Sequence, residues 1–125
     1  MFMEVNDLTG KIIGAAIEVH RVLGPGLLES VYEECLSHEL GTAKVPYERQ
    51  REIPVEYKGI KLSCGYRIDL LVAERIIVEI KSCDNILPIH EAQLLTYLKL
   101  TGLRVGLLIN FNVPILREGI KRIVN

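Results

Sequence analysis

The sequence predicts an α+β or mixed α/β fold, in which helices flank a central mixed sheet that contains an antiparallel meander. Two observations support this class. Apolar residues recur at helical spacing before residue 41, and the pattern changes to β-forming stretches between Val45 and Ser82. A further helix and a further strand follow without any internal repeat, so the order differs from a regular series of strand-helix-strand units.

Two N-terminal helices are predicted from apolar periodicity and from the residues that stop them. Over residues 7–23 apolar side chains recur every three or four positions, and the Gly-Pro-Gly sequence at 24–26 ends that helix. Residues 27–40 carry a denser stripe of the same kind, and Gly41 is expected to end it. Each helix should therefore place one apolar face against the rest of the domain.

The middle of the chain predicts a three-stranded antiparallel meander. Apolar residues alternate with other residues over 53–57, and Lys58 with Gly59 is typical of a turn. Residues 61–72 and 75–82 are rich in β-forming side chains. The second of these strands is long enough that we expect it to extend beyond its neighbours or to bend.

The C-terminal part predicts a helix, a strand and a short helix. Proline suits the first position of a helix, so we expect a helix from Pro88 to about Leu100, closed by Gly102. Residues 104–111 have the composition of a buried strand, and a short helix is predicted over 115–124.

Length and composition limit the function classes. The 125 residues are 49% hydrophobic, which suits a single domain spanning 1–125. The net charge of -1 excludes binding of nucleic acid through a strong overall basic charge, so a polyanion would need a local patch or a metal ion. Three cysteines without a C-x-x-C pair predict free buried thiols. The lack of an apolar run of about 20 residues predicts a soluble, cytoplasmic protein.

Two carboxylates are predicted to face each other on neighbouring strands. If a tight turn centred on Glu74 joins the strands, residues equidistant from it pair, so Asp69 lies opposite Glu79. Their Cα atoms would then lie about 4.5–5.5 Å apart. Because side chains alternate along a strand, Ile68 and Leu70 are expected to share the face opposite to Asp69.

The facing pair Asp69 and Glu79 needs compensation, because like charges opposite each other destabilise a sheet. A magnesium ion would supply it, since Mg²⁺ accepts a few carboxylate oxygens, a backbone carbonyl such as that of Ile80, and water or phosphate. Lys81 projects from the same face as Glu79, where it could orient an attacking water or neutralise charge on a phosphate. A solvated sheet face, with Asp69 beside an arginine, is equally compatible with strand geometry alone.

Helical side chains are candidates for the same site. Helical periodicity places Glu29 within the apolar stripe of the second helix, so it is expected to point inward and to be paired, protonated or metal-bound. A first-turn glutamate that answers the helix dipole is the alternative. In the third helix Gln93 and Tyr97 are i, i+4 neighbours near His90. This polar ridge would contact substrate or hold the ligands, unless Tyr97 is a core residue and His90 a cap.

The start of the second helix carries a motif that resembles a family signature. Residues 26–32, Gly-Leu-Leu-Glu-Ser-Val-Tyr, match that of the GxxExxY protein family, and residues 13–20 are also similar to it. That family is grouped with the PD-(D/E)xK nuclease superfamily, whose pattern resembles Asp69 followed by Glu-Ile-Lys at 79–81. The superfamily position before the aspartate is often proline, whereas this chain has Ile68. The helix with glutamine and tyrosine is similar to the Q-x-x-x-Y helix of RecB-like nucleases.

The resemblance implies a restriction-endonuclease-like core and a metal-dependent nuclease. The residues that it implies to be catalytic are Glu29, Asp69, Glu79 and Lys81. The implied ligands of Mg²⁺ or Mn²⁺ are Glu29, Asp69, Glu79 and the backbone of Ile80. The residues implied to support the site or to contact substrate are Gln93, Tyr97 and Tyr32.

Two functions remain open from the sequence. The first is hydrolysis of phosphodiester bonds in nucleic acid by metal-activated water, with DNA as the expected substrate. The alternative is a non-cleaving adaptor that binds nucleic acid or protein and retains the nuclease fold, which the near-neutral charge and the absence of a recognition module favour. A homodimer or a larger assembly would let so small a chain span a duplex.

Overall fold

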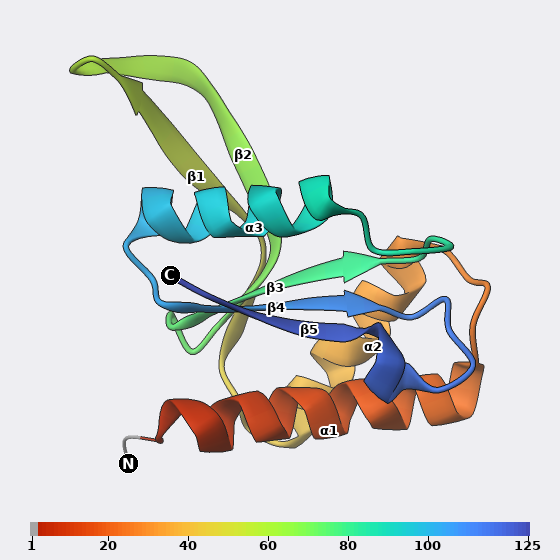
Figure 1. The fold of residues 1–125 in the computed structure, drawn as a ribbon. Helices are drawn as coiled ribbons and strands as arrows, with labels where there is room; N and C mark the ends of the chain where they lie inside the picture. Colours follow the sequence, from red (N-terminus) through yellow and green to blue (C-terminus); the bar gives the residue numbers. More distant parts are fainter. Residues whose placement is uncertain (1–2) are drawn as a thin grey trace.

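The computed structural model describes residues 3–125 as a five-stranded sheet with helices on both faces (Figure 1). The elements in chain order are α1 (Val5–Leu23), α2 (Glu29–Thr42), β1 (Tyr47–Tyr57), β2 (Ile60–Val72), β3 (Ile76–Lys81), α3 (Pro88–Thr101), β4 (Val105–Asn110), the 3-10 helix η1 (Leu116–Gly119) and β5 (Ile120–Val124). The strands lie in the order β1-β2-β3-β4-β5, and neighbours are antiparallel except for the parallel pair β3 and β4. The predicted mixed sheet with an antiparallel meander is therefore confirmed.

Two hydrophobic clusters fill the space on either side of the sheet. α1 and α2 cover one face (Figure 1), where Ile12 and Leu36 pack in one cluster with Val78. α3 covers the other face, where Leu94 belongs to a cluster with Ile77. The successive residues of β3 thus point into different clusters, so this strand and β4 are buried on both faces.

The helices lie near their predicted positions, with shifts at their ends. α1 begins at Val5, two residues earlier than expected, and α2 begins at Glu29 and runs past Gly41. Gly41 therefore does not end its helix, because a glycine backbone can also remain helical. α3 begins at Pro88 as predicted and is closed by Gly102, whose φ of 75° is left-handed. No described helix is long and apolar enough to cross a membrane.

The helix predicted over 115–124 is wrong. η1 is a single short turn, and the chain then continues as β5, which pairs antiparallel with β4. Since β4 is buried, a free edge on that strand would leave backbone groups without partners. β5 supplies those partners. The spacing of Ile120 and Ile123 is also found in helices, but the hydrogen bonds that β4 needs decide the structure here.

β1 and β2 form a long hairpin that rises past α3 (Figure 1). The predicted turn at Lys58 and Gly59 is present, with φ of 50° and 79°. β2 is 13 residues long but pairs with β3 only through its last three residues, so its first part leaves the central sheet, as its length suggested. Cys64 on this arm is exposed, so the expectation of buried thiols is wrong, although the cysteines are free.

Candidate active site

The tight turn between β2 and β3 produces the predicted register. Leu70 pairs with Val78, and both are equidistant from Glu74. Ala73 and Glu74 have φ of 52° and 55°, and they belong to the three-residue loop between the last paired residues of the two strands. The predicted register is therefore confirmed as far as Leu70 and Val78, and Asp69 and Glu79 are the next residues on the two strands.

The strand ladder stops just before the two carboxylates, which take over its hydrogen bonds. The last β2–β3 pair is that of Leu70. Beyond it, the backbone N–H of Asp69 donates to Oε2 of Glu79 at 2.7 Å, and the backbone N–H of Ile80 donates to Oδ2 of Asp69 at 2.8 Å. Each carboxylate is thus fixed by the backbone of the opposite strand, which sets both side chains at the point where the strands separate.

β2 changes direction at this point. Ile68 packs with Leu71 and Ile77 on the α3 side, whereas Leu70 packs on the α1 and α2 side. The expectation that Ile68 and Leu70 share a face is therefore wrong, because strict alternation holds only along a regular strand and β2 leaves β3 between these two residues.

Burial and mutual repulsion dominate the electrostatics of the pair. Glu79 is only 6% exposed, and burial followed by the negative charge of Asp69 raises its pKa from 4.5 to about 8. Burial also raises the pKa of Asp69, against the hydrogen bond from Ile80. The positive charge of Lys81 lowers the pKa of both carboxyl groups, and the negative charge of Glu29 raises both. The site therefore holds less positive charge than two ionised carboxylates need.

α2 contributes two glutamates whose burial differs from the prediction. Glu29 is exposed, so the expectation that it points inward is wrong, although its Oε2 accepts the backbone N–H of Ser82 at 3.3 Å beside the end of β3. Glu33 is buried instead, where it binds Arg49 and Gln50. Both glutamates lie on one helical stripe, but the first turn of α2 is left uncovered, which periodicity alone does not reveal.

Gln50 is the residue that the sequence reasoning missed. It lies on β1 between the paired residues Arg49 and Arg51, whose partners on β2 flank Asp69. Its Nε2 donates to Glu33 at 2.6 Å and points to Asp69 Oδ1 at 3.4 Å. The strand was expected only from residue 53, so no sequence signal placed Gln50 opposite a carboxylate.

α3 brings Tyr97 to the carboxylates. Tyr97 is 4% exposed, and burial followed by the negative charge of Glu79 raises the pKa of its hydroxyl. Its ring lies 5.4 Å from that of Tyr66, which is half exposed. Gln93 is exposed one turn earlier. His90 accepts the backbone N–H of Leu87 at 3.0 Å and thus caps the helix, which was the alternative to a role in the site.

Tyr32 is a support for the loop before Glu29. The ring is fully buried and stacks on Phe111 with centroids 4.4 Å apart. Its hydroxyl donates to the carbonyl of Gly24 at 2.6 Å and accepts the backbone N–H of Leu27 at 3.1 Å. A side chain held in this way fixes the path of the chain into α2 and is too buried to contact a substrate.

The donor set of Asp69 and Glu79 fits a hard divalent cation. Mg²⁺ commonly takes one or two protein carboxylates and keeps several waters, and a buried and a partly buried carboxylate that repel each other are stabilised by such an ion. Within residues 3–125 no three His, Cys, Asp or Glu side chains are grouped closely enough to hold a metal. Asp69 and Glu79 are therefore two candidate ligands that lie together. Ligation by them, by Glu29 or by the Ile80 carbonyl stays a prediction.

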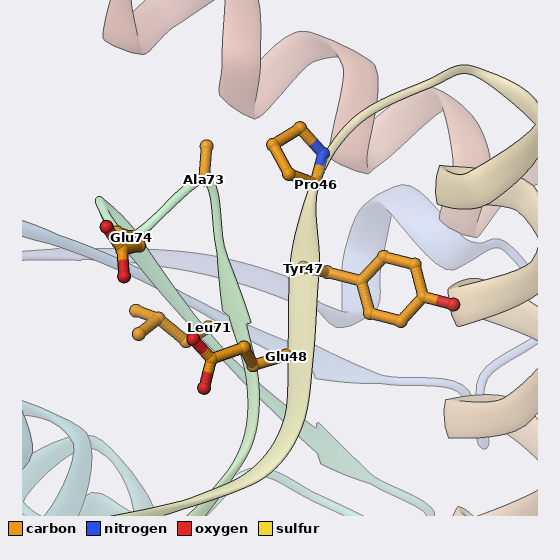
Figure 2. Close-up of a pocket in the computed structure, with 6 residues that line it drawn as sticks. All are labelled: Pro46, Tyr47, Glu48, Leu71, Ala73 and Glu74. Carbon is orange, nitrogen blue, oxygen red and sulfur yellow. The ribbon is translucent and has the colours of Figure 1, made fainter.

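A separate pocket lies beside the turn that joins β2 to β3, next to the start of β1. It has a volume of about 380 Å³, and Figure 2 shows the Glu48 and Glu74 carboxylates on one side of it and the Tyr47 ring directed toward a helix. The residues that line it are Pro46, Tyr47, Glu48, Leu71, Ala73 and Glu74. None of the predicted catalytic residues is among them, so the carboxylate pair and not this pocket defines the candidate site.

The chain is similar to known proteins in sequence and in fold. The family model described as the PD-(D/E)XK nuclease superfamily matches residues 6–123. A solved structure titled "Crystal structure of SSO0001" is similar, with a TM-score of 0.51 and 26% sequence identity over 74% of this chain and 46% of that chain. This chain thus spans about half the length of that one. A comparison with curated proteins found no match.

Proposed function

The chain belongs to the PD-(D/E)XK nuclease superfamily, and on that premise we propose that it hydrolyses phosphodiester bonds of nucleic acid, with DNA as substrate, with the help of a divalent cation. The observation that carries this proposal is the pair Asp69 and Glu79, each fixed by a backbone N–H of the opposite strand. Two carboxylates held together where β2 and β3 separate, one buried and one partly buried, are suited to hold a cation beside a phosphate.

Each residue of the site has a different role in the proposed hydrolysis. Asp69 and Glu79 would hold Mg²⁺ or Mn²⁺. When bound, that ion supplies Lewis-acid activation of the phosphate and of the attacking water. Lys81 places a positive charge near both carboxylates, where it would stabilise negative charge that develops on the phosphate. Tyr97 holds its hydroxyl in the field of Glu79, and Gln93 on the exposed side of α3 would contact the nucleic acid.

A titration and a cleavage screen test this proposal together. Mn²⁺ is titrated calorimetrically into the wild type and into Asp69→Ala, and both proteins are incubated with single-stranded, duplex and branched DNA and with RNA. We expect binding and cleavage in the wild type. We expect neither in the variant, because the single carboxylate that remains, that of Glu79, does not hold the ion. Glu34→Ala, which removes an exposed carboxylate from α2, is the matched control and should behave as the wild type. A wild type that binds Mn²⁺ and cuts no substrate would contradict the proposal.

A non-cleaving adaptor is the second candidate, and the pairing of the basic side chains favours it. Arg49 is bonded to Glu33, Arg51 to Glu48, and Lys121 to Glu91. These bonds leave less positive charge available for a nucleic-acid backbone than the count of 15 basic residues suggests. An adaptor would bind DNA in a gel-shift assay without cutting it at any Mn²⁺ concentration, whereas cleavage that Asp69→Ala abolishes would exclude this function.

A further inference from the structure

The backbone of Gln50 adopts a conformation that its side chain alone does not favour. Its φ of 52° is left-handed, a region where residues with a Cβ are strained and which glycine adopts most readily. The residue is exposed, so burial in the core does not compensate for this strain. Non-glycine residues in such conformations concentrate at functional sites, where surrounding contacts hold them in place.

The contacts of Gln50 are two carboxylates from different elements. Nε2 donates to Oε1 of Glu33 on α2 at 2.6 Å and is directed at Oδ1 of Asp69 on β2 at 3.4 Å. Both neighbours are acceptors, so the NH₂ end of the amide faces them and the carbonyl end points elsewhere. Glu33 is 6% exposed and is also held by Nε of Arg49 at 3.1 Å, so it is a fixed anchor for the amide.

These contacts complete the restraint on Asp69. Its Oδ2 accepts the backbone N–H of Ile80 at 2.8 Å, and its Oδ1 faces the Gln50 amide. With one oxygen restrained, the carboxylate could rotate about its Cβ–Cγ bond, whereas two restraints define its plane. The strained turn of the backbone at Gln50 brings the amide to the side of Asp69 that β3 does not reach.

We propose that Gln50 is a positioning residue of the candidate active site, which sets the plane of the Asp69 carboxylate through a hydrogen bond whose direction Glu33 fixes. The effect of Gln50 on cleavage rests on the proposed nuclease function, whereas its effect on cation affinity can be measured without that function. Partners that orient metal ligands in this way typically change metal affinity or activity by about 10–100-fold when they are removed. The competing explanation is that Gln50 only ties β1 to α2 through Glu33.

Gln50→Met tests the proposal, because methionine has nearly the same shape and no N–H. Mn²⁺ affinity is measured by calorimetry, cleavage on the best substrate of the wild type, and thermal unfolding in the absence of cation. We expect Mn²⁺ affinity to fall about 10-fold or more, with a matching loss of cleavage rate. Arg51→Met is the control on the same strand: it removes an exposed pair with Glu48 and should leave both quantities unchanged.

A second pair of variants separates positioning from folding. Gln50→Ala and Gln50→Gly both lack the amide, but only glycine relieves the positive φ. We expect Gln50→Gly to unfold at a higher temperature than Gln50→Ala while both bind Mn²⁺ as weakly as Gln50→Met.

The outcomes distinguish this inference from the proposed function. Unchanged Mn²⁺ affinity in Gln50→Met, alongside complete loss in Asp69→Ala, would overturn the positioning role and leave the nuclease proposal intact. Weakened affinity in Gln50→Met, in a wild type that binds Mn²⁺ but cuts nothing, would support the positioning role and contradict the nuclease. If Gln50→Met lowers the unfolding temperature and changes nothing else, the side chain only connects β1 to α2, and the positioning role is overturned.

Discussion

Glu79 should make the cation-free protein less stable as the pH rises. Its pKa is raised from 4.5 in the unfolded chain to about 8 in the folded one, first by burial and then by Asp69. A raised pKa means that the folded state prefers the protonated form, so the stability from this preference is complete below pH 4.5 and is lost as the pH rises through about 8. At about 1.4 kcal/mol per pKa unit, the loss over this interval is on the order of 5 kcal/mol.

Urea unfolding with a chelator present, at pH 5 and at pH 8, measures this loss. The wild type should be less stable at pH 8 by several kcal/mol, which is a large part of the usual stability of a domain. Glu79→Gln resembles the protonated side chain and keeps an oxygen that can accept the N–H of Asp69. Most of the pH dependence should therefore disappear in the variant, and Asp69, whose pKa is also raised, accounts for the remainder.

Mn²⁺ should reverse the effect in the wild type alone. At pH 8 the ion compensates the two ionised carboxylates, and binding to the folded state stabilises it by mass action. Glu74→Gln, which changes an exposed glutamate in the turn, should keep the slope of the wild type. Equal losses of stability in wild type and Glu79→Gln between pH 5 and pH 8, or equal stabilisation of the two proteins by Mn²⁺, would show that Glu79 is not the source of the pH dependence.

Three further substitutions have expected outcomes. Lys81→Met should lower the cleavage rate by about 10²–10³-fold in single-turnover assays, since it removes a positive charge that acts on both carboxylates, and unchanged cleavage would remove Lys81 from the mechanism. Tyr32→Phe should cost about 1–3 kcal/mol in urea unfolding, because two hydrogen bonds of the Gly24–Leu27 loop are lost, with Mn²⁺ affinity within about twofold of the wild type. Glu29→Gln should weaken Mn²⁺ binding in calorimetry less than Asp69→Ala does, because Glu29 is exposed, and an equal loss would make it a principal ligand.

The paired carboxylates could be predicted because the interactions that place them are local. The turn at Ala73 and Glu74 joins two short apolar stretches, and a period of two along both strands then determines which residues face each other. No contact distant in sequence is needed to bring Asp69 to Glu79. The capping of α3 at Pro88 and its end at Gly102 were predictable for the same reason.

Two of the failed predictions depend on contacts between distant segments. The short helix expected at the C-terminus is β5, because β4 needs a partner strand that only the assembled sheet creates. Glu29 and Glu33 lie on one stripe of α2, and which of them is buried depends on where β1 places Arg49 and Gln50. Helical periodicity identifies the stripe but does not indicate which other elements pack on it.

The sequence by itself determined the fold class, the register of β2 against β3 and the carboxylate pair, because these follow from local periodicity, turn geometry and residue chemistry. Only the tertiary structure decided how those residues are restrained. Where β2 leaves β3, the Glu79 carboxylate accepts the backbone N–H of Asp69, and the Asp69 carboxylate accepts the backbone N–H of Ile80. The approach of Gln50 to Asp69 arises where β1 adopts a strained φ beside a buried glutamate. The first feature requires β2 and β3 to meet, and the second requires β1, β2 and α2 to meet. The free energy that holds them comes from packing that no single segment contains.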